Sequence, residues 1–108
     1  MKVGEFIGAL YKKKLDTGEE KWFLHEGKIT KIVQNSKGTK VYSSAFYPLD
    51  IEEIEDNTEC MEENNNFILT REVVLLTDKI RSKYEKWIKW ANNNLNKVEF
   101  VFSGEDKQ

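Results

Sequence analysis

Cysteine, histidine and proline each occur only once in this chain of 108 residues, and that scarcity excludes several kinds of site. The lone Cys60 has no partner for an internal disulfide. It also stands between Glu59 and Glu62, whose negative charges disfavour a reactive thiolate. The lone His25 can supply neither a pair of metal-ligating histidines nor a recognisable catalytic triad. We expect His25 to lie on the surface of a strand or at the edge of a loop.

Other hallmarks are missing as well. No apolar run approaches the roughly 20 residues of a membrane span, and the N-terminus lacks the apolar stretch of a secretory signal, so a cytoplasmic location is expected. Gly4 and Gly8 are isolated, which excludes a glycine-rich phosphate loop. The acid-rich run lacks the spacing and the glycine of an EF-hand. We therefore predict no catalytic residues, no metal, no cofactor and no enzymatic activity.

What the chain does contain is enough apolar surface for one core. Apolar residues make up 39% and aromatic residues 12% of the sequence, against 33% charged residues. This composition is typical of a soluble, very polar globule of one domain. We expect that domain to span residues 1–103, with an acidic loop at about 50–66 inserted in it and a polar tail at 104–108.

The formal net charge of -2 hides a strongly segregated layout. Residues 1–48 carry nine lysines against five acids, and residues 67–95 carry six basic residues against three acids. Between them, the run from Leu49 to Glu63 has eight acids and no base. Local fields should therefore govern the choice of partners more than the overall charge does.

The first half of the chain is predicted to be β. Lys12 to Glu19 is typical of a strand end and a turn, and Trp22 to His25 of a second strand. The clearest hairpin has the turn Asn35-Ser36-Lys37-Gly38 between arms rich in β-branched and aromatic residues. Pro48 should then interrupt strand pairing, because proline has no N–H to donate.

The second half is predicted to contain a long loop, one helix and two strands. Asp50 and Glu53 have the spacing to cap one helical turn. The rest of the acidic run is expected to be exposed loop up to a short strand at Phe67–Leu69. A helix should follow at about 71–94 with Thr70 as its N-cap, and a last strand at 98–102. The apolar stripe of this helix recurs at steps of three and four: Val73, Leu76, Ile80, Tyr84, Trp87, Ala91 and Leu95.

These elements predict a mainly β protein with one long helix, in the α+β class. The simplest arrangement is a small SH3-like antiparallel barrel, or a bent sheet, packed by the helix. An open sheet with the helix across one face is the alternative. The oligomeric state stays open, because the apolar edge at 98–102 can pair either within the chain or with a second copy.

Three segments resemble small uncharacterised SH3-like proteins of low-GC Gram-positive bacteria and their phages. They are the run Glu26 to Ile32, the Gly38-centred hairpin that ends at Tyr42, and Phe67 to Glu72 opening a helix. The resemblance covers about residues 22–76 and implies a binding module of a mobile element. These relatives have no catalytic motif to transfer, and the Trp-rich helix and the acidic insertion depart from their pattern.

The acidic run is the first candidate site. A folded scaffold that presents carboxylates can occupy a basic groove in place of the phosphates of a nucleic acid. Ile51, Ile54 and Met61 lie within the run, either as apolar binding anchors ringed by charge or as core contacts. A solubilising loop is an equally good interpretation. The partner-binding residues predicted here are Asp50, Glu52, Glu53, Glu55, Asp56, Glu59, Glu62 and Glu63.

The second candidate site is a basic face of the helix. Lysines neutralise phosphates and an exposed ring can stack on a base, so this combination is typical of nucleic-acid surfaces. An ordinary solvated face with Trp90 packed over the sheet edge is the favoured alternative. The candidate nucleic-acid-binding residues are Lys79, Lys83, Lys86, Lys89 and Trp90.

Together these observations favour a non-enzymatic protein-binding module of a phage or mobile element. Its partner would be a larger host or phage protein with a basic groove. The sharpest form of the hypothesis is an inhibitor of a host nucleic-acid-handling or defence complex, such as an anti-CRISPR. The alternative is a nucleic-acid-binding protein that uses the basic helix face.

Overall fold

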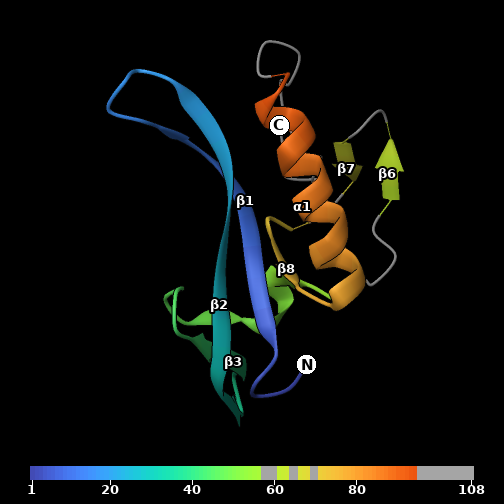
Figure 1. The fold of residues 1–108 in the computed structure, drawn as a ribbon. Helices are drawn as coiled ribbons and strands as arrows, with labels where there is room; N and C mark the ends of the chain where they lie inside the picture. The colour runs from blue at the N-terminus through green and yellow to red at the C-terminus, as the bar shows by residue number, and fades with distance from the viewer. Residues whose placement is uncertain (57–60, 64–65, 69–70, 95–108) are drawn as a thin grey trace.

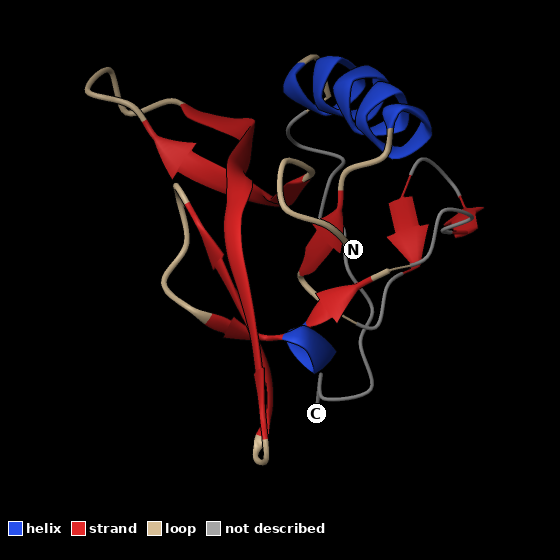
Figure 2. Ribbon diagram, turned by 90° about the horizontal axis from the view of Figure 1, so that it is seen from below, coloured by secondary structure: helices blue, strands red, loops and turns tan. Residues whose placement is uncertain are grey.

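The protein is mainly β, with one helix packed on a curled sheet (Figures 1 and 2). The structure, a computed structural model, describes residues 1–56, 61–63, 66–68 and 71–94. The main sheet has six strands in the order β4-β3-β2-β1-β8-β5, and β6 and β7 form a separate two-stranded sheet. The elements are β1 (Phe6–Lys14), β2 (Glu20–Asn35), β3 (Gly38–Ser43), β4 (Leu49–Asp50), the 3-10 turn η1 (Ile51–Glu53), β5 (Ile54–Glu55), β6 (Met61–Glu63), β7 (Asn66–Ile68), β8 (Val73–Leu75) and α1 (Asp78–Asn92).

The sheet is antiparallel except at one edge, where β5 pairs with β8 in parallel. Its strands curl into an open half-barrel instead of a flat layer (Figure 2). The predicted class of a bent, mainly antiparallel sheet packed by a helix is therefore confirmed in outline. The strand predicted at 98–102 and the polar tail lie outside the described residues.

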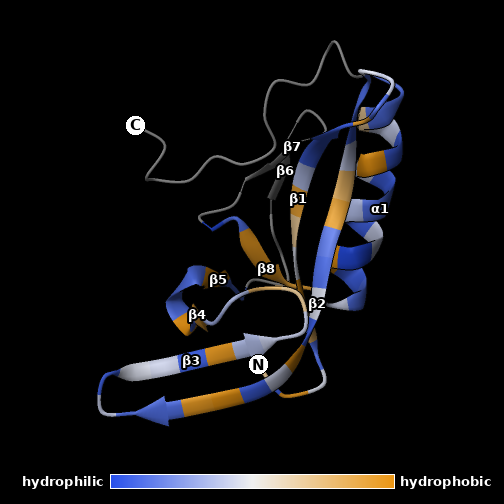
Figure 3. Ribbon diagram, turned by 90° about the vertical axis from the view of Figure 1, so that its left-hand side faces the viewer, coloured by the Kyte–Doolittle hydropathy of each residue, from blue (hydrophilic) through white to orange (hydrophobic). Residues whose placement is uncertain are grey.

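β2 is one strand of 16 residues, whereas the sequence predicted two separate strands in this region. Its first half pairs with β1 and its second half with β3. The register shifts between Ile29 and Lys31, and such an irregularity bends a strand and increases its twist. Because of this bend, β3 turns away from the β1–β2 ribbon (Figure 3).

The predicted hairpin at Asn35 to Gly38 is confirmed. Asn35 faces Gly38 across the β2–β3 ladder, and the Asn35 side chain accepts a hydrogen bond of 2.8 Å from the Lys37 N–H. Gly38 has a φ of 132°, which a residue with a side chain rarely adopts. The turn is therefore determined by local chemistry.

Two hydrophobic clusters lie on the two faces of the sheet. β8 contributes to both, because Val74 points into one cluster and Leu75 into the other. The cluster under the helix contains Trp22, Val74, Leu76, Ile80, Tyr84, Trp87 and Ala91. The cluster on the concave side contains Ile7, Ile29, Val41, Leu49, Ile54 and Leu75.

The helix is shorter than predicted. α1 begins at Asp78, and its N-cap is Thr77, whose Oγ1 accepts a hydrogen bond of 3.2 Å from the Ile80 N–H. Thr70 is therefore not the cap, and the segment Val73–Leu75 is a strand that pairs with β1 and β5. Strand pairing with distant partners outweighs the helical spacing of these residues, and consecutive apolar residues suit a strand that is buried on both faces.

The predicted apolar stripe is confirmed from Ile80 to Ala91, whereas Val73 and Leu76 precede the helix. Its buried residues are Ile80, Tyr84, Trp87 and Ala91, which recur at steps of three and four and face the sheet. Leu95 lies outside the described residues. Fully burying one such large side chain stabilises the fold by roughly 1.5–3 kcal/mol, so this stripe holds the helix in place.

Candidate functional site

The acidic run is not the single exposed loop that the sequence predicted. Its first part forms β4, η1 and β5, and its second part contributes β6. Ile54 is buried at 5% exposure and Ile51 packs partly against the same cluster. These two residues are therefore core contacts and not exposed binding anchors, because the chain here adds edge strands to the curled sheet.

Within residues 49–56, where exposure is described, four acids are exposed: Asp50, Glu52, Glu53 and Asp56. We call these four residues the acidic edge. The backbone beneath them is tied down on both sides, since β4 pairs with β3 and β5 pairs with β8. The acidic edge is thus presented by ordered backbone, which lowers the conformational entropy lost on binding.

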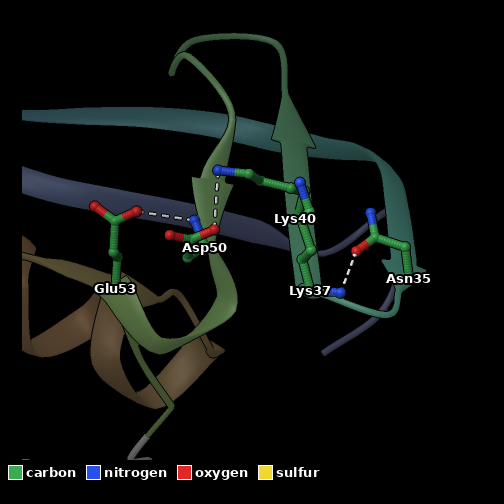
Figure 4. Close-up of polar contacts among 5 residues, drawn as sticks. All are labelled: Asn35, Lys37, Lys40, Asp50 and Glu53. Atoms are coloured by element: carbon green, nitrogen blue, oxygen red, sulfur yellow. Dashed lines mark hydrogen bonds and ion pairs between the residues drawn. The ribbon is translucent and has the colours of Figure 1, made fainter.

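Local hydrogen bonds hold this segment in shape, and the predicted capping turn is confirmed. The Glu53 Oε1 accepts a hydrogen bond of 2.9 Å from the Asp50 N–H at the start of η1 (Figure 4). The Asp50 carboxylate forms an ion pair of 2.9 Å with the Lys40 ammonium across the β3–β4 ladder. The hydrogen bond to Asp50 raises the pKa of Lys40 above its usual value. One carboxylate of the acidic edge is therefore already partly neutralised.

A base from elsewhere in the chain also reaches this segment. Arg71 Nε donates a hydrogen bond of 2.7 Å to the Glu52 carbonyl oxygen. The run has no base in sequence, yet in space it has Lys40 and Arg71 beside it. Of the other predicted partner-binding residues, Glu55 is half-buried on β5, Glu62 and Glu63 belong to β6, and Glu59 lies outside the described residues.

The basic helix face lacks the exposed ring that nucleic-acid stacking requires. Lys79, Lys86 and Lys89 are exposed and Lys83 is half-buried. Trp90 packs partly against the cluster under the helix, with its ring 6.4 Å from that of Trp87. The alternative interpretation was a solvated face with Trp90 packed over the sheet edge. The half-burial of Trp90 is compatible with a packed ring, and the choice between the two interpretations stays a prediction.

His25 lies exposed on β2, as expected for a strand-surface residue. Its Nε2 is 3.0 Å from the Ala45 carbonyl oxygen. Because a carbonyl oxygen only accepts hydrogen bonds, Nε2 is the donor in this contact. Cys60 lies outside the described residues. Within the described part of the chain, no group of three or more His, Cys, Asp or Glu residues could hold a metal ion.

Sequence reasoning missed one surface, on the β1–β2 hairpin. Three cross-strand pairs follow one another on the face opposite the helix: Ala9 with His25, Tyr11 with Phe23, and Lys13 with Lys21. We call these six residues the hairpin face. An open hollow of about 430 Å³ on it is lined by Ala9, Tyr11, Lys13 and His25. The signal that would have revealed it is the period-two alternation in both arms, read together with the register of the hairpin.

No protein-family model, curated protein or solved structure matches the chain. In the described part of the chain, no helix is both long enough and apolar enough to cross a membrane.

Proposed function

We propose that this chain is a non-enzymatic protein-binding module whose acidic edge docks on a basic groove of a larger protein. The observation that carries the proposal is the presentation of four exposed acids on a capped turn anchored by Ile51 and Ile54. Ordered carboxylates with little apolar surface between them attract lysine- and arginine-rich grooves and accelerate association.

The specific form of the proposal is an inhibitor carried by a phage or mobile element and acting in the cytoplasm of its host. In it, the acidic edge replaces the phosphates of a nucleic acid in a nucleic-acid-handling or defence complex, as in an anti-CRISPR. The segregated charge and the small size support this form, and kinship of residues 22–76 with SH3-like phage and bacterial proteins is part of the proposal.

The experiment is a pull-down from host lysate after nuclease treatment, with mass spectrometry of the captured proteins. The test variant is the double charge reversal Glu52→Lys with Asp56→Lys, which leaves the Glu53 cap and the Lys40–Asp50 ion pair intact. The matched control is Glu19→Lys with Glu85→Lys, which changes the net charge equally at exposed positions outside the acidic edge.

A partner that binds the native chain and the control but not the test variant, and that is released by added salt, supports the proposal. Equal capture by all three chains contradicts it, because the acidic edge would then make no contribution to binding.

The alternative is nucleic-acid binding by the basic helix face. The observation that favours it is the exposure of Lys79, Lys86 and Lys89 on α1. It predicts an electrophoretic shift of DNA or RNA at low ionic strength that is lost when these three lysines are replaced by Gln. A shift that survives the replacement rules out this face as the site.

A further inference from the structure

The hairpin face is built by the alternation of side chains along β1 and β2. The residues that point the other way, Leu10 and Leu24, face each other across the ladder and pack against the cluster under the helix. Side chains of neighbouring residues must therefore point away from the helix. Because Leu10 and Leu24 are packed under the helix, the side chains of the hairpin face are held pointing away from it.

A continuous row of aromatic rings crosses this face. The Tyr11 ring centroid is 5.7 Å from that of Phe23 and 6.0 Å from that of His25, which it meets edge to face. His25 in turn lies 4.7 Å from Phe46. Tyr11, in the middle of the row, is 39% exposed, although its neighbours hold it from two sides. An exposed ring that is already oriented loses little entropy when a planar group stacks on it.

Two lysines of like charge border the row. Lys13 and Lys21 are directly opposite each other in the ladder and both are exposed. Like charges in this arrangement destabilise a hairpin. On the other face of the same strands, Lys12 forms an ion pair of 3.9 Å with Glu20. Among the ion pairs of the described residues, none includes Lys13 or Lys21. A bound anion would relieve their repulsion.

The hollow beside the aromatic row is a shallow and open depression. It offers about 430 Å³ and is lined by Ala9, Tyr11, Lys13 and His25, so a planar group can reach the Tyr11 ring from solvent. The small side chain of Ala9 leaves space on this face, and the Tyr11 and His25 rings, in edge-to-face contact, line it together with Lys13. The hydrogen bond from His25 to the Ala45 carbonyl fixes the imidazole ring at the border of the hollow.

From this arrangement we propose that the hairpin face binds a single-stranded nucleic acid. A base stacks on Tyr11 in the hollow, and Lys13 and Lys21 neutralise the adjoining phosphates. A single strand fits better than a duplex, because only unpaired bases present their faces to an aromatic ring. The proposal does not depend on the acidic edge, which belongs to another part of the sheet.

The test is fluorescence anisotropy of a labelled oligothymidylate of about ten nucleotides, a length within the range that single-strand sites cover, with the full chain at low salt. Tyr11→Ala should weaken binding about 5- to 150-fold, the loss expected for one stacking ring, whereas Tyr11→Phe should retain it. Lys13→Gln with Lys21→Gln should reduce the slope of log affinity against log salt by about 0.7 for each phosphate that is no longer neutralised. Lys37→Gln, on the β2–β3 turn, is the control for charge.

Three results would overturn the proposal. The first is no binding by the native chain at low salt. The second is unchanged affinity in Tyr11→Ala and in the double lysine variant. The third is a concentration-dependent dimer that Tyr11→Ala abolishes, which would make the hairpin face an interface between two copies.

Folding of each variant is checked by its thermal unfolding. The double lysine variant should unfold no earlier than the native chain, because it removes a repulsion, so it remains informative if Tyr11→Ala fails to fold. Glu52→Lys with Asp56→Lys should not weaken oligonucleotide binding, and this keeps failure of the present proposal distinct from failure of the proposed function.

Discussion

The side-chain amide of Asn92 pairs with the backbone of Trp22 in the way that a neighbouring strand would. Asn92 Oδ1 accepts a hydrogen bond of 2.7 Å from the Trp22 N–H, and Asn92 Nδ2 donates one of 3.2 Å to the Trp22 carbonyl. β3 pairs only with the second half of β2, so this part of β2 has an open edge. The end of α1 is thereby fastened to the hairpin.

Asn92→Ala should therefore destabilise the protein. The change leaves a part-buried N–H and carbonyl without their partner, which costs about 1–3 kcal/mol in the free energy of unfolding. Urea denaturation measures the difference. Asn93→Ala, one residue on and exposed, is the matched control and should change stability by no more than about 0.5 kcal/mol. Equal midpoints for the two variants would show that the amide contributes nothing.

Thr77→Ala should lower the stability of α1. The hydroxyl accepts the hydrogen bond from the Ile80 N–H at the start of the helix, and loss of such a cap costs about 0.5–2 kcal/mol. Thermal unfolding followed by circular dichroism measures the loss. Thr77→Ser and Thr77→Asp retain an acceptor and should restore most of the stability. A destabilisation common to all three variants would mean that the threonine methyl group matters and not the cap.

Gly27→Ala should displace the segment that follows β3. A Cβ on Gly27 would lie 2.9 Å from both the Cβ and the backbone nitrogen of Ala45. Overpacking of this kind costs about 1–3 kcal/mol. The thermal midpoint should fall, and the NMR signals of His25 and Phe46 should shift, because their ring contact depends on the same segment. Adding Ala45→Gly removes one of the two contacts and should recover part of the loss.

The Lys40–Asp50 ion pair should make a small contribution to stability that disappears at alkaline pH. The hydrogen bond to Asp50 raises the pKa of Lys40, so the folded protein holds this proton more tightly than the unfolded chain does. The contribution is complete below the pKa of an unfolded lysine and is lost as the pH rises through the higher pKa of the folded protein.

An NMR titration of the Lys40 side chain checks this directly. Asp50→Ala removes both the hydrogen-bond acceptor and the negative charge that raise the pKa of Lys40, so that pKa should return towards its usual value. An unchanged titration in that variant would contradict the assignment. Lys40→Gln also leaves Asp50 without its base, and it should strengthen binding of a basic partner if the acidic edge is the docking site.

Prediction from sequence succeeded where the determining contacts are local. The Asn35–Gly38 turn, the Asp50–Glu53 cap and the stripe from Ile80 to Ala91 all depend on residues within a few positions of one another, and all are present in the structure. It failed for Val73–Leu75, because the choice between strand and helix there was made by β1 and β5, which are distant in sequence.

The candidate sites also combine features that the sequence shows with features that only the structure shows. The concentration of charge in the acidic run is a property of the sequence. The ion pair from Lys40 and the hydrogen bond from Arg71 to the backbone of this run are visible only in space. Likewise, nothing in the sequence distinguishes Lys13 and Lys21 from other lysines of a polar stretch. It is the hairpin register that places them directly opposite each other.

By itself, the sequence determined the composition of the core, the turns, the helical stripe and the segregation of charge, since these depend on residue type and short-range spacing. Only the tertiary structure decided which strands meet. Strand pairing converts alternating side chains into faces, and the register between β1 and β2 placed Tyr11, Phe23 and His25 in one row with two lysines beside them.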